Sequence, residues 1–295
     1  MTFLYYLQSL LARALVASAG RLPLNALEWI TRRAGDLSCL FMPKRRGVAA
    51  ANIDKAFGSS LSDAQKKNLV RAAFQHAALS IAELFLVRRI AARAREHFSL
   101  MGNEVLEKAF ARGNGVVLVI SHIGSWEYLS FLPFLTGQRW SVVVKHIKNP
   151  FMNREIDALR RVMTVTPILK NNSTRKVLQE LKEDHGVAIL IDQWAGPEGI
   201  WSPLFGAETS TTSIPARLAK RTGCALVPAY CVRTAPWKYE IQIHPEVPVQ
   251  EPEGDWETAT TRELDRLLER QILKYPEQWM WGHRRWKDKP SSLRA

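Results

Sequence analysis

A histidine and a glutamate near the middle of the chain have the types and spacing of a general base and its partner. The segment Ser121–Glu127 reads Ser-His-Ile-Gly-Ser-Trp-Glu and directly follows the apolar run Val116–Ile120. Glu127 lies five positions after His122, and Gly124 between them permits a tight bend. A carboxylate beside an imidazole fixes its tautomer and stabilises the imidazolium that forms when the ring takes a proton. The pattern therefore predicts that His122 is a catalytic base and that Glu127 orients and charges it.

Other chemistries need residues that this chain lacks. Ser125 is not followed by the second glycine of a Gly-x-Ser-x-Gly nucleophile motif. A zinc protease would carry His-Glu-x-x-His on one helix, and that motif is absent. The three cysteines form neither a metal-ligand spacing nor an even disulfide set. We therefore predict no metal ion and no cofactor. A histidine-to-glutamate spacing also arises by chance, so its setting after an apolar strand carries much of the interpretation.

Short β-branched runs alternate with helical patterns through most of the chain. Val116–Ile120 is apolar on both faces, which is typical of a central strand covered by helices. Such alternation implies an α/β protein with a mixed, largely parallel central sheet flanked by helices, in which functional residues gather at the carboxyl ends of strands. Further strands are predicted over residues 141–144, 187–191, 225–230 and, at an edge, 238–243, and helices over residues 63 to the high 80s, 101–111, 151–162, 174–184 and 212–221.

The chain divides into an amino-terminal helical segment, residues 1–50, and a catalytic domain, residues 51–295. Ser62 and Gln65 match a capping box at the start of the helix predicted from residue 63. His76 on that helix is interpreted as a buried residue with a satisfied partner rather than a ligand. No internal repeat or low-complexity linker separates further domains.

The amino-terminal third is the cationic part of the protein and begins with an apolar segment. The net charge is +13, and residues 1–99 hold fifteen basic and six acidic side chains. Residues 1–12 carry no charge, but no basic residue precedes Arg13, unlike in a signal peptide. No charge-free run reaches the roughly 18 residues of a membrane span. We therefore predict an interfacial membrane anchor that lies on an anionic surface, with an ordinary packed amphipathic helix or a tilted span as alternatives.

Aromatic and basic residues interleave near the carboxyl terminus, as they do at nucleic-acid sites. The segment holds Trp279, Trp281, Trp286, His283, Arg284, Arg285 and Lys287. An apolar amino-terminal segment has no role in a nucleic-acid-binding protein, so we predict no nucleic-acid partner. Rings and guanidinium groups also stack structurally or bind lipid phosphate. Trp286 and the Arg284–Arg285 pair are therefore expected to brace the sheet or a headgroup.

Six sequence blocks in order resemble those of the bacterial lipid A late (lauroyl/myristoyl) acyltransferases, within the glycerolipid acyltransferase superfamily. A histidine followed by an acidic residue after four intervening positions resembles the superfamily's signature. The blocks span about residues 50 to 287 and comprise Asn52–Phe57, His122–Glu127, Asn149–Pro150 with Arg160, Asp192–Gln193, Leu204–Gly206, and Tyr275–Trp281 with His283–Lys287. Gly282 departs from that branch, which usually has leucine there.

The resemblance implies an O-acyltransferase that forms no acyl-enzyme. His122 would deprotonate an acceptor hydroxyl, which attacks the carbonyl of an acyl thioester, while Glu127 orients the histidine. Arg160 would stabilise negative charge on an acceptor phosphate or on the oxyanion, unless it is a solvated helix arginine like Arg161. Asp192 would hold Arg160 or a substrate hydroxyl, or have only a structural role. Ser125 is a further candidate for substrate binding.

The resemblance also implies the partners and the location. The donor would be acyl-acyl carrier protein or acyl-CoA, and the acceptor a lipid A precursor or a similar phosphoglycolipid. A lysophospholipid, an ornithine lipid or a mannosylated lipid is the alternative acceptor, and a non-catalytic basic lipid-binding protein is the alternative function. The expected location is the cytoplasmic leaflet of the inner membrane.

Overall fold

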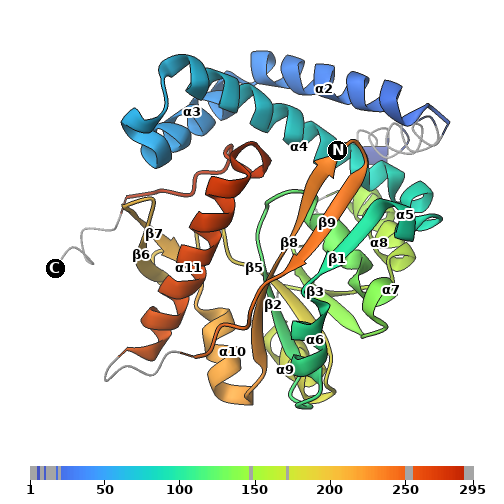
Figure 1. Ribbon diagram of the computed structural model, residues 1–295, viewed down its shortest axis with the longest axis vertical. Helices are drawn as coiled ribbons and strands as arrows, with labels where there is room; N and C mark the ends of the chain where they lie inside the picture. The colour runs from blue at the N-terminus through green and yellow to red at the C-terminus, as the bar shows by residue number, and fades with distance from the viewer. Residues whose placement is uncertain are drawn as a thin grey trace.

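A seven-stranded sheet forms the centre of the protein (Figure 1). The computed structural model describes residues 5–6, 10, 18, 21–145, 149–170, 173–249 and 255–288. Every neighbouring pair in the sheet is parallel except β8 with β9. The predicted mixed, largely parallel sheet is therefore confirmed. In spatial order the strands are β1 (Phe98–Met101), β9 (Lys238–Ile243), β8 (Ala225–Ala235), β2 (Val116–Ile120), β5 (Gly186–Leu190), β3 (Trp140–Val144) and β4 (Thr166–Leu169).

Strand β2 is buried on both of its faces because helices cover the sheet on each side. All five of its residues are buried. Leu118 and Ile120 belong to the apolar core on one face, and Val117 and Val119 to the core on the other. Side chains alternate along a strand, so an apolar run without polar interruptions is what this position requires.

Different helices supply the two cores. The first core contains side chains of α4 (Asp63–Ala91), α6 (Asn103–Phe110), η2 (Trp126–Phe131), α7 (Leu132–Thr136) and α8 (Pro150–Val162). The second contains side chains of α9 (Ser173–Lys182), α10 (Ile214–Thr222) and α11 (Trp256–Lys274). The predicted helices over residues 101–111, 151–162, 174–184 and 212–221 are thus confirmed within a few residues.

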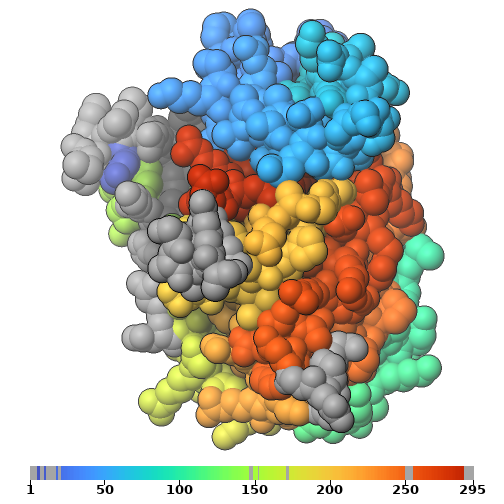
Figure 2. Space-filling model, turned by 90° about the vertical axis from the view of Figure 1, so that its left-hand side faces the viewer, coloured from blue at the N-terminus to red at the C-terminus, as the bar shows by residue number. Residues whose placement is uncertain are grey.

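Two amino-terminal helices pack on α4. They are α2 (Leu24–Phe41) and α3 (Pro43–Phe57), and Figure 2 shows them in blue as a cap over one end of the molecule. Gly35 permits the crossing of α2 and α4, because an added Cβ would lie 2.5 Å from Gln75 Cα. The predicted division at residue 50 falls inside α3. The capping box of α4 is present, with Ser62 N donating to Gln65 Oε1 at 2.8 Å and Gln65 N to Ser62 Oγ.

The prediction that residues 238–243 form an edge strand is wrong. β9 pairs with β8 on one side and with β1 on the other, so β1 occupies the edge. Phe98 of β1 stacks in an aromatic cluster with Tyr128 and Tyr239, and this packing holds a strand too short to give a sequence signal. The remaining elements are α5 (Ala94–His97), η1 (Gly58–Ser60), η3 (Pro276–Gln278) and an antiparallel hairpin of β6 (Ile200–Leu204) and β7 (Ala207–Thr211).

Candidate active site

The pairing of β2 with β5 brings His122 and Asp192 together at the carboxyl ends of the two strands. Ile120 is the register partner of Leu190, and the strands are parallel. His122 and Asp192 each follow these paired residues by two positions. Equal offsets from paired positions in parallel strands place two side chains at the same height, so the contact follows from the register.

Asp192 holds both the ring and the backbone of His122. Its Oδ1 accepts a hydrogen bond from His122 Nδ1 at 2.8 Å, and its Oδ2 accepts one from the His122 backbone N–H at 2.9 Å. Trp279 Nε1 donates to the same Oδ2, also at 2.9 Å. Because a carboxylate can only accept, this arrangement places the imidazole proton on Nδ1 and leaves the Nε2 lone pair free to take a proton.

The charges of the pair stabilise each other. Burial lowers the pKa of His122, but Asp192 and, less strongly, Glu127 raise it, and the net result lies above its ordinary value. Burial raises the pKa of Asp192, but the His122 imidazole and the hydrogen bonds from His122 and Trp279 outweigh burial and lower that pKa to about 2. Asp192 is therefore ionised at neutral pH, and it favours the protonated form of His122 that proton abstraction would produce.

The imidazole of His122 is partly exposed, and an exposed amide lies next to its Nε2. The side chain of His122 is 11% exposed, whereas that of Asp192 is 2% exposed. The Gln193 amide nitrogen lies 3.3 Å from His122 Nε2, and the Trp126 ring packs edge-on to the imidazole with centroids 5.1 Å apart. Gln193 is exposed, so its amide can give way to another group at Nε2.

Glu127 faces Arg160 rather than the His122 ring. Glu127 lies in the first turn of η2, and its Oε1 is 3.5 Å from Arg160 Nη2. The spacing predicted that Glu127 orients the imidazole, but Asp192 accepts the hydrogen bonds of Nδ1 and of the His122 backbone N–H. The effect of Glu127 on His122 is electrostatic, because its charge raises the pKa of the imidazole.

Arg160 is a buried cation with loosely held partners. Its side chain is 10% exposed, and its contacts to Glu127 and Asp157 are both 3.5 Å long. Within the described part of the chain, Arg160 Nε is buried and has no hydrogen-bond partner. A guanidinium with a free donor can bind a phosphate or an oxyanion without first losing a strong ion pair. Its burial distinguishes it from Arg161, which is exposed.

Two candidates have different neighbours from those expected. Asp192 does not contact Arg160, because its oxygens are taken by His122 and Trp279. Ser125 is 2% exposed, and its hydroxyl accepts a hydrogen bond from Arg233 Nη2 at 3.1 Å. The Ser125 hydroxyl therefore belongs to the interior and is not presented to a substrate.

Residues of the carboxyl-terminal block support the site. Motif spacing alone did not indicate that Trp279 would contact Asp192 or that Gln193 would lie next to His122 Nε2. Arg285 is fully buried and donates to the backbone oxygens of Gln193 and Ser210, each at 2.7 Å. Asn52 Nδ2 donates to the backbone oxygens of Trp281 and His283. Arg285 therefore ties β7 of the hairpin to the loop that follows β5, whereas the Arg284–Arg285 pair was expected to brace the sheet or a headgroup.

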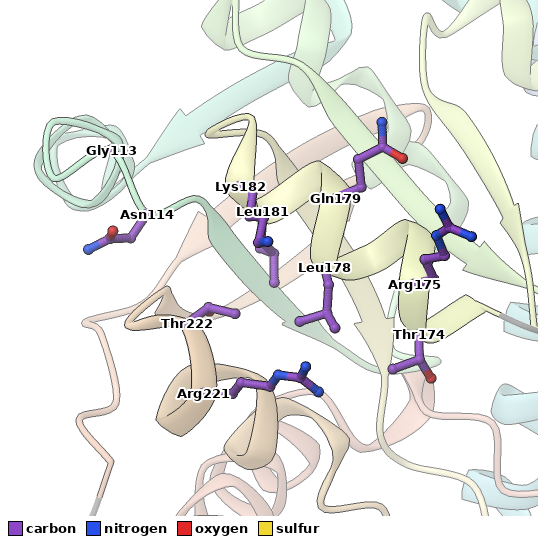
Figure 3. Close-up of a pocket in the computed structure, with 10 residues that line it drawn as sticks. All are labelled: Gly113, Asn114, Thr174, Arg175, Leu178, Gln179, Leu181, Lys182, Arg221 and Thr222. Atoms are coloured by element: carbon purple, nitrogen blue, oxygen red, sulfur yellow. The ribbon is translucent and has the colours of Figure 1, made fainter.

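A cavity of about 1020 Å³ lies away from this site (Figure 3). It runs between α9 and α10 and is lined at one end by Gly113 and Asn114, which precede β2, so it lies at the opposite end of that strand from His122.

In the residues that the structure describes, no group of three or more His, Cys, Asp or Glu side chains could hold a metal ion. The hydrogen bond between His122 and Asp192 and the ion pair between Glu127 and Arg160 suit the His122 site to acid–base and electrostatic chemistry.

The sequence of the chain matches a family of known proteins. The model of the bacterial lipid A biosynthesis acyltransferase family matches residues 2–288. The chain belongs to this family. It is 24% identical over 274 residues to the lipid A biosynthesis palmitoleoyltransferase of Escherichia coli, covering 92% of this chain and 88% of that protein. It is 26% identical over 267 residues to the lipid A biosynthesis lauroyltransferase of the same organism, covering 88% and 84%. The protein is thus an acyltransferase.

A further curated relative and one solved structure also match the chain. The phosphatidylinositol mannoside acyltransferase of Mycolicibacterium smegmatis is 24% identical over 202 residues, covering 66% of this chain and 64% of that protein. The crystal structure of the 1-acyl-sn-glycerophosphate acyltransferase PlsC from Thermotoga maritima aligns with a TM-score of 0.40 at 15% identity, covering 87% of this chain and 100% of that chain.

Proposed function

We propose that the protein transfers a fatty acyl chain from a thioester to a hydroxyl of a lipid A precursor or a similar phosphoglycolipid. The observation that carries this proposal is the 2.8 Å contact between His122 Nδ1 and Asp192, which leaves the Nε2 lone pair to accept a proton. The family's acyl-transfer activity supplies the reaction class, and the site supplies the base.

His122 Nε2 takes the proton of the acceptor hydroxyl, whose oxygen bonds to the thioester carbonyl carbon. The tetrahedral intermediate then collapses with cleavage of the C–S bond. The imidazolium returns its proton to the departing thiolate, so His122 is again neutral at the end of the cycle. Asp192 keeps the imidazole in the productive tautomer through both steps, and no acyl-enzyme forms.

Arg160 is the group that would stabilise the negative charge of the acceptor or of the oxyanion. Its Nη1 and Nη2 contacts to Asp157 and Glu127 are both 3.5 Å long, so an incoming phosphate or oxyanion could compete for the guanidinium. Glu127 contacts Arg160 Nη2 and adds negative potential at the imidazole. A single well-placed donor at a developing oxyanion is worth about 3 to 4 kcal/mol, which is the scale of the contribution proposed for Arg160.

The outer face of α2 supports attachment to a membrane surface. Trp29, Arg33, Leu37 and Phe41 recur at four-residue intervals and form one stripe, with Leu40 beside it; Trp29 is 63% and Phe41 74% exposed. The buried residues of α2, Leu27, Thr31 and Gly35, are offset by two positions, which turns them to the opposite side. An apolar stripe bordered by exposed cations suits the interface of an anionic bilayer.

No membrane span is needed for this attachment. Among the residues described, one helix, α4, is long and apolar enough to cross a bilayer. It packs against α2, α3 and α8 and carries the buried His76 and Glu83, which is typical of the core helix of a folded body. The anchor predicted over residues 1–20 lies mostly outside the described residues. We infer that the enzyme works at the cytoplasmic leaflet of the inner membrane, where acyl-acyl carrier protein or acyl-CoA reaches it.

Turnover with defined substrates tests the proposal. Purified enzyme is incubated with radiolabelled acyl-acyl carrier protein or acyl-CoA and, in parallel, a lipid A precursor, a lysophospholipid, an ornithine lipid and a mannosylated lipid. Acylation of the lipid A precursor at the highest kcat/KM is the expected result. Transfer only to another acceptor would replace the substrate assignment, and binding without any transfer would reject the enzymatic role.

A mannosylated lipid is the second candidate acceptor. The similarity to the phosphatidylinositol mannoside acyltransferases favours it, although it covers less of this chain than the similarity to the lipid A enzymes. Both acceptor classes present a sugar hydroxyl near a phosphate. His122 would deprotonate the hydroxyl, and Arg160 would bind the phosphate.

A further inference from the structure

A buried polar cluster on α4 and β8 contacts the middle of the segment that joins His122 to Glu127. His76, Ser80 and Glu83 lie at intervals of four and three residues on one side of α4, and all three are buried. Arg233 of β8 reaches them with a side chain that is 8% exposed. The hydrogen bonds that the cluster makes to this segment go to Gly124 and Ser125, which lie between His122 and Glu127.

The Gly124 carbonyl is held by α4. His76 Nε2 donates to this oxygen at 3.1 Å, and Ser80 Oγ lies 3.3 Å from it. Arg233 Nη1 donates to His76 Nδ1 at 2.7 Å, and because a guanidinium cannot accept, Nδ1 must carry the lone pair. His76 is thereby fixed as the neutral tautomer that donates to Gly124. Burial and the charge of Arg233 also lower the pKa of His76 well below its usual range.

The Ser125 hydroxyl is held by β8. Arg233 Nη2 donates to Ser125 Oγ at 3.1 Å, while Arg233 Nε donates to Glu83 Oε1 at 3.0 Å. One planar guanidinium therefore contacts Glu83, His76 and Ser125 at once, which a lysine in its place could not do. The geometry links α4 rigidly to the segment on which His122 and Glu127 are carried.

Backbone contacts hold the same two residues from the other side. Gly124 N donates to Gln278 O at 2.9 Å, and Ser125 N donates to Cys231 O at 2.7 Å. Gln278 in turn bonds the backbone N–H and C=O of Arg233 through its side chain. We call these side-chain and backbone contacts to Gly124 and Ser125 the clamp. The α4 cluster supplies its side-chain contacts, and removing them would free the Gly124 carbonyl while leaving the strand pairing intact.

We propose that His76, Ser80, Glu83 and Arg233 are positioning residues that set the placement of His122 relative to Glu127 and Arg160. The inference rests on the acyl transfer proposed above. The clamp acts between the base and the residue that orients Arg160, so loosening it separates the proton-transfer group from the charge-stabilising group. A misplacement of about 1 Å in such a site lowers turnover by up to roughly 100-fold.

A pair of substitutions at His76 tests the proposal. Gln in place of His can donate to Gly124 O and accept from Arg233, whereas Leu can do neither. We expect His76→Leu to lower kcat roughly 10- to 100-fold with KM changed less than about threefold, and His76→Gln to recover kcat to within about threefold of the wild type. Rates are compared below the unfolding transition of each variant, so that loss of folded protein does not enter.

A matched control removes a buried polar pair elsewhere. Gln271 of α11 is buried and donates to Gln242 at 2.9 Å, far along the chain from His122 and outside the site. Gln271→Leu is expected to lower the melting temperature while leaving kcat within about twofold. If His76→Leu does not fold, Ser80→Ala, which removes one neutral hydroxyl, serves in its place with an expected decrease of about threefold in kcat.

Two outcomes overturn the proposal. One is wild-type kcat in folded His76→Leu or Ser80→Ala, and the other is equal loss in His76→Gln and His76→Leu. The imidazole ¹⁵N resonances of His122 supply a readout that does not need turnover, and they should shift in His76→Leu but not in Gln271→Leu. If wild-type enzyme transfers no acyl chain while these resonances shift as expected, the proposed function fails and the positioning role stands.

Discussion

At the residue scale, the chemistry depends on which nitrogen of His122 holds the proton. Asp192→Asn replaces an obligate acceptor with an amide that can donate to Nδ1, which would move the imidazole proton to Nε2. We expect kcat to fall by about 10²- to 10⁴-fold with the fold retained. Measurement of kcat/KM against pH adds a signature. Asp192 raises the pKa of His122, and general-base activity is lost as the pH falls through that pKa, so the substitution should move the acid limb to lower pH.

Unchanged kcat in Asp192→Asn would show that the aspartate serves only to support the strands. A limb that moves to higher pH would contradict the electrostatic account, because removing a neighbouring negative charge cannot raise the pKa of an imidazole.

The two residues on either side of the Gly124 bend should both be needed. His122→Ala and Glu127→Ala are each expected to lose at least about 100-fold in kcat/KM, the usual scale for removal of a base or of a charge that supports it. Asp157→Ala is the matched control, because Asp157 contacts the same Arg160 guanidinium at the same 3.5 Å but lies on α8 itself. Turnover near that of the wild type in either test variant would reject the assigned roles.

The sequence predicted the base but assigned its orientation to the wrong neighbour. A spacing of five residues is visible in a linear pattern, and it singled out Glu127. Asp192 is seventy positions away, and its contact depends on the pairing of Ile120 with Leu190, which no local pattern encodes. A signal did exist, since both His122 and Asp192 come just after apolar runs. Carboxylate and imidazole after two neighbouring parallel strands would predict the contact if the strand order were known.

At the element scale, the bend between β2 and η2 depends on Gly124. Its φ is +64°, and an added Cβ would lie 2.0 Å from the carbonyl oxygen of Cys231. Gly124→Ala should lower the free energy of unfolding by about 2 to 4 kcal/mol and reduce kcat, because the segment must shift away from β8. Gly137→Ala is the control, with φ of +72° and nothing within 4 Å of the added Cβ. It should lose only about 1 kcal/mol in urea unfolding and keep its turnover.

The outer stripe of α2 should carry the attachment to lipid. The triple variant Trp29→Gln, Leu37→Gln and Phe41→Gln is expected to bind vesicles of phosphatidylglycerol and phosphatidylethanolamine at least about tenfold more weakly, because each large apolar side chain contributes of order 1 kcal/mol or more on transfer from water. Vesicle sedimentation measures the effect. Met101→Gln, Ile214→Gln and Leu273→Gln, at similarly exposed positions elsewhere, should leave binding unchanged.

Equal losses in the two triple variants would indicate a diffuse apolar effect rather than a docking face. A change in oligomeric state without a change in vesicle binding would instead assign the stripe to contact with a second copy or another protein.

Elements with strong periodicity were predictable and short ones were not. The runs that became β2, β5 and β8 are apolar over four or more residues, β3 contains three consecutive valines, and a capping box marks the start of α4. β1, β4 and the β6–β7 hairpin are short or polar on one side, and each is held by contacts distant in sequence. The hairpin, for example, is tied down by Arg285, whose guanidinium bonds Ser210 O and Thr211 Oγ1.

At the scale of the whole molecule, the charge of +13 should make lipid binding sensitive to salt. Exposed Arg33 lies within the stripe of α2, and exposed Lys44 and Arg46 follow it in the first turn of α3. Their attraction to anionic headgroups is screened beyond about one Debye length. Binding to vesicles with phosphatidylglycerol should weaken roughly tenfold between about 0.05 and 0.5 M salt. Vesicles of phosphatidylcholine alone should show weaker binding with little salt dependence, since only the apolar term remains.

The pairing of Ile120 with Leu190 also limits the kinds of mutation that β2 and β5 can tolerate. A single-residue insertion or deletion within β2 or β5 would turn every following side chain to the other face of the sheet and carry the imidazole into one of the helix layers. Natural variation and directed-evolution libraries should therefore tolerate length changes in the connections between elements, and only point substitutions between Val116 and His122 or between Gly186 and Asp192.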